Sequence, residues 1–162
     1  MLFSSDRRGY LVKAFAAVLF TIAGASAFAG EKPPAIFSTE EGAIRGYDPV
    51  AYFKQNKPVK GKKELSYKWQ DAEWHFSTQA NLDAFKANPE KFAPQYGGYC
   101  AYGVAQGYTP EIDPASFKVV SGKLYLNLSP EVLRRWKKDI PGYVKDADKN
   151  WPELKAGTYV EK

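Results

Sequence analysis

Beyond its first thirty residues, this chain offers one cysteine and one histidine for chemistry, Cys100 and His75. Cys100 lies in the glycine-rich stretch GGYCAYGVAQG, and His75 lies in WHFS. A closed zinc site needs about four ligands, usually Cys and His, and the only methionine is Met1. These numbers disfavour a zinc cage. Copper(I) accepts two or three soft ligands, so a Cys100–His75 pair could bind it.

Two other roles for Cys100 are open. A cysteine–histidine pair can perform nucleophilic catalysis if the base lies within hydrogen-bond reach and a third group orients it. No known nucleophile signature surrounds Cys100, so no catalytic residue is predicted. Alternatively, Cys100 is a small buried side chain in a glycine-rich turn, because free cysteine behaves as a hydrophobe.

Tyrosine and aspartate side chains indicate a second kind of site. Tyr47 and Asp48 occur together in GYDPVAYF, and Tyr99 lies beside Cys100. Tyrosines on a rigid loop can line a small pocket or a partner surface at low entropic cost. We therefore expect Tyr47, Asp48 and Tyr99 to contact a small ligand or an envelope protein partner.

The first 29 residues have the features of a signal peptide. Arg7, Arg8 and Lys13 form a positively charged start, and the apolar run that follows ends in two A-x-A cleavage sites. That run of 16 residues is shorter than the roughly 20 that a membrane-spanning helix needs. The sequence therefore predicts a periplasmic protein with no membrane span after cleavage. DRRGYLVK partly resembles a twin-arginine signal, so this route and the general secretory route are both open.

The remainder of the chain is mildly basic, with a formal charge of +3, and is rich in aromatic residues. Its lysines and arginines are spread along the sequence, so no nucleic-acid partner is expected. The 162-residue chain contains 10 Phe, 11 Tyr and 4 Trp, which is typical of one domain with an aromatic core. A single cysteine permits no internal disulfide, so folding depends on that core.

Two β-hairpins, each followed by a helix, are predicted. Apolar and polar residues alternate in ELSYKWQDAEWHFS and again in FKVVSGKLYLNL. At an offset of 51 residues the two following helices match at Leu82 with Leu133 and at Phe85 with Trp136. Further helices are expected after Asn88 and over DIPGYVKDADKNWPEL. The sequence thus predicts an α+β fold, with two hairpin–helix units in a small antiparallel sheet and helices packed on one side.

These elements define a single domain at residues 46–155. A loose lead-in segment at 30–45 precedes it, and a tail at 156–162 follows it. Because side chains alternate along a strand, His75 should face away from Trp74 and Phe76 and occupy a half-exposed position or a separate pocket.

Residues 46–100 resemble a YHS domain. The resemblance rests on Asp-Pro-Val at 48–50, Trp-His-Phe-Ser at 74–77 and ANPEKF at 87–92. YHS domains are similar to the cysteine-rich metal-binding domains of the TRASH type and occur attached to metal-transporting ATPases and monooxygenases, so the resemblance implies metal handling. Metal-binding members carry cysteines where this chain has Ala51 and, near the Phe-Ser motif, Thr78 or its neighbours. That departure removes the thiolates on which the metal prediction depends.

The predicted function is therefore that of an exported, non-enzymatic binding protein of the YHS family. Its ligand would be a transition-metal ion, copper or zinc, held by Cys100 and His75. The alternative is a small-ligand or protein-interaction module that binds no metal and in which Cys100 is structural.

Overall fold

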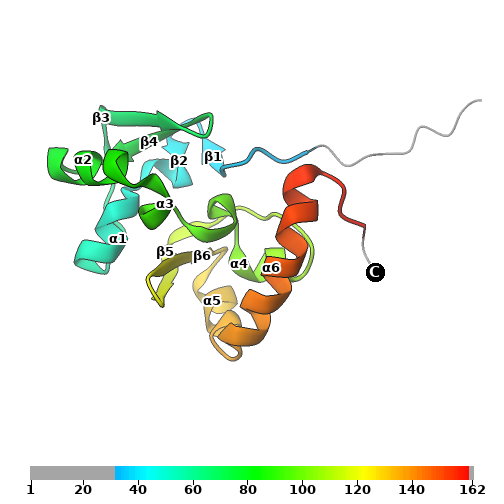
Figure 1. Cartoon of the computed structure of the whole chain (residues 1–162). Coiled ribbons are helices and arrows are strands. Elements are labelled where there is room, and N and C mark those ends of the chain that lie inside the picture. Colours follow the sequence, from blue (N-terminus) through cyan, green and yellow to red (C-terminus); the bar gives the residue numbers. More distant parts are fainter. Residues whose placement is uncertain (1–31, 161–162) are drawn as a thin grey trace, which may run out of the picture.

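The computed structural model describes residues 32–160, which form helices around three antiparallel hairpins (Figure 1). The leader predicted for residues 1–29 lies outside the described residues. The predicted α+β class is confirmed. Within residues 32–160, no helix is long and apolar enough to cross a membrane.

The first half of the described chain contains a short 3-10 helix and an α-helix, then a hairpin and two more α-helices. These elements are η1 (Ile44–Gly46), α1 (Pro49–Gln55), β3 (Lys62–Trp69), β4 (Ala72–Phe76), α2 (Gln79–Ala87) and α3 (Pro89–Phe92). Side-chain oxygens of Asp48, Thr78 and Asn88 accept hydrogen bonds from first-turn amides of α1, α2 and α3. Such caps satisfy amides that have no partner within the helix, so they fix where each helix begins.

The aromatic core of the first half lies between α2 and one face of the β3–β4 hairpin. The Phe85 ring lies 5.2 Å from the rings of Trp74 and Phe76 and 5.8 Å from that of Trp69. These strand residues share a face, as their alternation predicts. Phe85, Trp74 and Phe76 are fully buried, and each such side chain contributes about 1.5–3 kcal/mol to stability.

The second half contains η2 (Gln95–Gly98), α4 (Ala101–Ala105), β5 (Asp113–Val120), β6 (Lys123–Asn127), α5 (Pro130–Trp136) and α6 (Ile140–Ala156). Ser129 and Asp139 cap α5 and α6. The long helix α6 packs along α4, and the Asn150 amide donates to the carbonyl oxygens of Val104 and Ala105 at 3.1 and 3.0 Å. These bonds satisfy carbonyls at the C-terminal end of α4.

The hairpins remain separate two-stranded sheets rather than joining into the one small sheet that the sequence analysis expected. Between the β3–β4 and β5–β6 hairpins, α3 and η2 contact β6, so helical segments occupy this junction (Figure 1). The third hairpin, β1 (Ser38–Thr39) with β2 (Gly42–Ala43), lies in the segment that was expected to be a loose lead-in. Ile36, Ala43 and Ile44 of this region are buried and belong to the core. Two-residue strands are too short to show alternation, so the sequence did not reveal them.

Candidate functional site

His75 faces away from α2, as the strand alternation predicts, and is enclosed by backbone. Its side chain is 4% exposed, and Nε2 lies 2.8 Å from Glu73 Oε1. A Cβ atom added to Gly42 or Gly46 would lie 3.2 Å from the imidazole ring, and one added to Gly61 would lie 2.6 Å from His75 Cβ. Neighbouring chain thus covers the ring, and the only hydrogen bond that it makes within residues 32–160 is to Glu73.

Cys100 occupies the N-cap position of α4 and is 1% exposed. Its thiol donates to Asn127 Oδ1 at 3.8 Å, and the Tyr102 amide donates to the same oxygen at 3.2 Å. Burial raises the pKa of the Cys100 thiol, although the backbone amides of Gly103, Leu128 and Tyr102 act in the opposite direction. Because the thiolate is the form that binds metals and attacks electrophiles, a buried protonated thiol suits neither role.

Asp48 is fully buried and accepts five hydrogen bonds. Oδ1 accepts from the amides of Val50 and Ala51 at 2.9 and 3.2 Å. Oδ2 accepts from the Ser77 backbone amide at 2.8 Å, the Ser77 hydroxyl at 2.6 Å and the Asn81 side-chain amide at 2.7 Å. This carboxylate ties α1 to the end of β4 and to α2, and it has little capacity left for a ligand.

The two tyrosines predicted to bind a ligand have different surroundings. Tyr47 is partly buried, and the Lys60 ammonium lies 5.0 Å from its ring centroid. Tyr99 is buried, and its hydroxyl donates to the Pro34 carbonyl at 3.1 Å, which holds the N-terminal segment. The structure does not gather Tyr47, Asp48 and Tyr99 into one of the described pockets.

The side chains that could bind a metal are not clustered. Within residues 32–160 there is no group of three or more His, Cys, Asp or Glu side chains able to hold an ion. His75 and Cys100 share no hydrogen-bond partner in the described chain. Where metal-binding relatives have cysteines, Ala51 is fully buried in α1 and Thr78 caps α2. These residues do not fit the transition-metal site that the resemblance implies.

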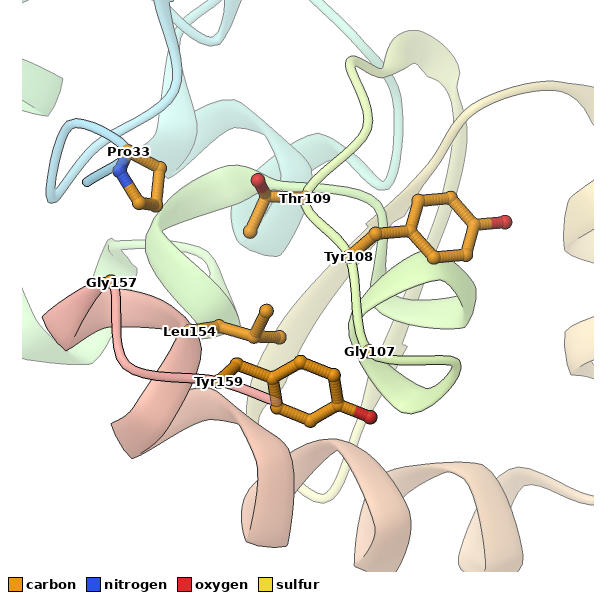
Figure 2. Close-up of a pocket in the computed structure, with 7 residues that line it drawn as sticks. All are labelled: Pro33, Gly107, Tyr108, Thr109, Leu154, Gly157 and Tyr159. Carbon is orange, nitrogen blue, oxygen red and sulfur yellow. The ribbon is translucent and has the colours of Figure 1, made fainter. Parts of the chain in front are cut away.

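A cavity of about 250 Å³ lies between the loop at 107–109 and the end of α6. In Figure 2, Pro33, Thr109, Leu154 and the Tyr159 ring surround the hollow, and the Tyr108 ring points away from it. Gly107 has φ of +92°, and a Cβ atom there would lie 2.2 Å from the Tyr159 hydroxyl oxygen. A glycine is therefore required where this loop meets Tyr159.

The lining of the cavity is suited to binding rather than to acid–base or nucleophilic chemistry. It consists of Pro33, Gly107, Tyr108, Thr109, Leu154, Gly157 and Tyr159, and apart from tyrosine none of these residues is titratable. The Thr109 methyl group points toward Leu154, whereas the hydroxyls of Thr109 and Tyr159 lie on the outer side of the residues that surround the hollow (Figure 2). Sequence reasoning did not find this site because its two walls are about 45 residues apart and carry no motif. The one sign of this site in the sequence was Tyr159, an aromatic residue just beyond the last predicted helix.

A comparison with protein families identifies part of the chain. Residues 50–96 match the family model of the YHS domain. This chain contains a YHS domain. The match confirms the predicted resemblance and runs from α1 into η2, so it ends before Cys100 and includes no residue of the cavity in Figure 2. No curated protein and no solved structure gives a significant match.

Proposed function

We propose that this YHS-domain protein is a non-enzymatic binding protein whose ligand is a small, mainly apolar molecule held between the loop at 107–109 and α6. The observation that carries the proposal is the cavity itself. It has apolar walls from Pro33 and Leu154 and a tyrosine ring, and hydroxyl groups of Thr109 and Tyr159 lie at its rim. Ligand sites are typically concave and mainly apolar, with a few convergent polar groups.

Burial of the reactive side chains supports binding over catalysis. Cys100 and His75 are enclosed, and burial raises the pKa of the Cys100 thiol. The cavity offers neither a nucleophile with an adjacent base nor a carboxylate pair. Its size and lining suit an aromatic or alicyclic ring that carries one hydrogen-bonding group.

The proposed place of action is the periplasm. The support is the positively charged start, apolar run and small-residue cleavage sites in residues 1–29. A protein secreted by its own leader would meet ligands of the envelope, and the cavity begins at Pro33, four residues beyond the predicted cleavage point.

The test measures the binding of small fragments to the exported chain by protein NMR. Phenol, indole and cyclohexanol are the probes. We expect shifts confined to residues around Thr109, Leu154 and Tyr159. Thr109→Trp should fill the hollow and abolish the shifts. Tyr108→Ala is the matched control, because its ring points away from the cavity (Figure 2) and should be dispensable.

Two results would contradict the proposal. The first is that none of the probes shifts the cavity residues, or that Tyr108→Ala weakens binding as much as Thr109→Trp does. The second comes from elemental analysis of the natively exported protein. One copper or zinc per chain, lost in both Cys100→Ala and His75→Ala, would restore the metal function that the donor geometry disfavours.

A further inference from the structure

The described chain contains the same sequence of elements twice. Shifting the β3–β4 hairpin by 51 residues reproduces the bounds of β5–β6, from 62–69 and 72–76 to 113–120 and 123–127. The strand pairing repeats as well, since Lys62 pairs with Phe76 and Asp113 pairs with Asn127. Both hairpins then break register within the next four residues. Two independent hairpins would have no reason to share an irregularity at the same place.

The segments that follow the hairpins repeat at the same offset. Thr78 and Ser129 cap the next helix in each half, and Asn88 and Asp139 cap the one after it. The core pairs also agree in geometry. Trp74 and Phe85 have ring centroids 5.2 Å apart at 35°, and Tyr125 and Trp136 have centroids 5.2 Å apart at 37°.

The segments that precede the hairpins repeat at an offset of 52. Residues 44–46 and 96–98 all have positive φ, and each run leads into a tyrosine, Tyr47 or Tyr99. The next residue occupies the N-cap position of a helix, Asp48 for α1 and Cys100 for α4, although only Asp48 accepts hydrogen bonds there through its side chain. The backbone contact at this point also repeats. The Asp48 amide donates to the Val59 carbonyl at 2.8 Å, and the Cys100 amide donates to the Pro110 carbonyl at 3.2 Å.

We infer that residues 96–156 are a second, diverged YHS unit, and that Cys100 occupies in it the capping site that Asp48 occupies in the first unit, residues 44–92. The amides around the two side chains correspond one by one. Those of Val50, Ala51 and Ser77 donate to the Asp48 carboxylate. Those of Tyr102, Gly103 and Leu128 come from the corresponding positions of the second unit, where they oppose the rise in the pKa of the Cys100 thiol but form no cap hydrogen bond with it.

An unpaired amide beside Cys100 indicates that this site suits a carboxylate. Asn127 is fully buried, and within residues 32–160 its Nδ2 has no hydrogen-bond partner. In the first unit a side-chain amide, that of Asn81, donates to the Asp48 carboxylate at 2.7 Å. In the second unit Asn127 presents its Oδ1 to the Cys100 thiol, so a carboxylate at position 100 could accept from the unpaired Nδ2 once that amide turned over.

The family comparison matches only the first unit because little of its motif persists in the second. Around the cap, GYDPV in the first unit corresponds to GYCAY in the second, so the glycine and the tyrosine are the shared letters. The histidine of the first hairpin corresponds to Leu126, and Asn88-Pro89 corresponds to Asp139-Ile140. The two units thus share their backbone geometry and the positions of their helix N-caps, and few residue types.

Thermal unfolding of Cys100→Asp in the exported full-length protein tests this inference. A buried carboxylate placed at random normally prevents folding. We expect Cys100→Asp to fold and to melt within about 5 °C of the native protein at pH 7, since backbone amides at the positions that bind Asp48 and the unpaired Asn127 Nδ2 could donate to the new carboxylate. Val104→Asp is the matched control, because Val104 lies in α4, whose N-cap is Cys100, is fully buried and is not at an N-cap position. It should fail to fold.

The pH dependence distinguishes a capped carboxylate from one that is merely tolerated. Hydrogen bonds to the ionised form lower the pKa of a carboxyl group, so its stabilisation is present at neutral pH and is lost as the pH falls through the folded-state pKa. The melting temperature of Cys100→Asp should therefore fall relative to the native protein between about pH 5 and pH 2. Failure to fold, like that of Val104→Asp, or a melting difference that does not change with pH, would overturn the inference.

Discussion

The two halves of this protein share one backbone plan but maintain it with different chemistry. In the first unit a buried carboxylate, Asp48, accepts five hydrogen bonds and joins α1, β4 and α2. In the second unit the same position holds Cys100, and two buried donors of that unit, Asn127 Nδ2 and Trp136 Nε1, have no hydrogen-bond partner within residues 32–160. A fold can therefore survive the loss of its central polar contact when other packing replaces it.

That other packing comes from α6. Its counterpart in the first unit, α3, has four residues, whereas α6 has 17 and runs along α4 (Figure 1). The extension supplies Leu154 and leads to Tyr159, which form one wall of the cavity. The half that matches the YHS family model is thus built around a buried polar contact, and the diverged half contains the proposed ligand site.

The largest expected effect concerns the two capping residues. Asp48→Ala leaves several buried donors unpaired and should lower the free energy of unfolding by at least about 3 kcal/mol. Cys100→Ala removes one buried sulfur and a weak hydrogen bond, which should cost about 1–2 kcal/mol. Urea denaturation of both variants measures the difference. Equal losses would mean that the thiol is as important to its unit as the carboxylate is to the other.

A smaller effect is expected at the glycine that borders the cavity. Gly107→Ala would place a methyl group 2.2 Å from the Tyr159 hydroxyl at φ of +92°, so it should displace Tyr159, reduce fragment binding and cost about 2 kcal/mol. Gly122→Ala in the β5–β6 turn is the control. It has φ of +75° and no atom within 4 Å, so it should cost about 1 kcal/mol and leave binding unchanged. If Gly107→Ala and Gly122→Ala reduced fragment binding to the same extent, the cavity beside Gly107 would not be the place where the fragments bind.

The smallest effect is a pH dependence confined to the second unit. Burial raises the pKa of the Cys100 thiol, so the unfolded chain ionises first as the pH rises above about 8.5. The stability contributed by the neutral thiol is fully present below that pH and is lost above it. Chemical denaturation at pH 7 and pH 9.5 should show a larger loss in the native protein than in Cys100→Ser, which has no ionisable group there. Identical losses would indicate that the thiol is not held in its neutral form.

Sequence reasoning succeeded where the signal was local. Alternation around Trp69 and Trp74 predicted the first hairpin and the orientation of His75, and Thr78, Ser129 and the Asn88-Pro89 step marked helix starts. It also found the matching core positions Leu82 and Leu133. Each of these features depends on neighbours within a few residues, which is the range over which propensity and capping act.

The rest of the structure depended on contacts between distant segments. The enclosure of His75 requires Gly42 and Gly46 to approach its ring and Gly61 to approach its backbone, and no pattern in the sequence records that. The role of Cys100 was also hidden, because its counterpart Asp48 differs in residue type and lies 52 positions earlier. The resemblance implied metal binding, but the surroundings of Cys100 and His75 indicate structural positions for both residues.

The most direct test of the relation between the two units is a crystal structure of Cys100→Asp. The account predicts that the new carboxylate will superimpose on that of Asp48 when the two units are aligned, accepting hydrogen bonds from the amides of Tyr102, Gly103 and Leu128. The Asn127 amide should turn to donate to it, as Asn81 does in the first unit. A carboxylate that points away from these amides, or an α4 that shifts to expose it to solvent, would contradict the equivalence of the two units.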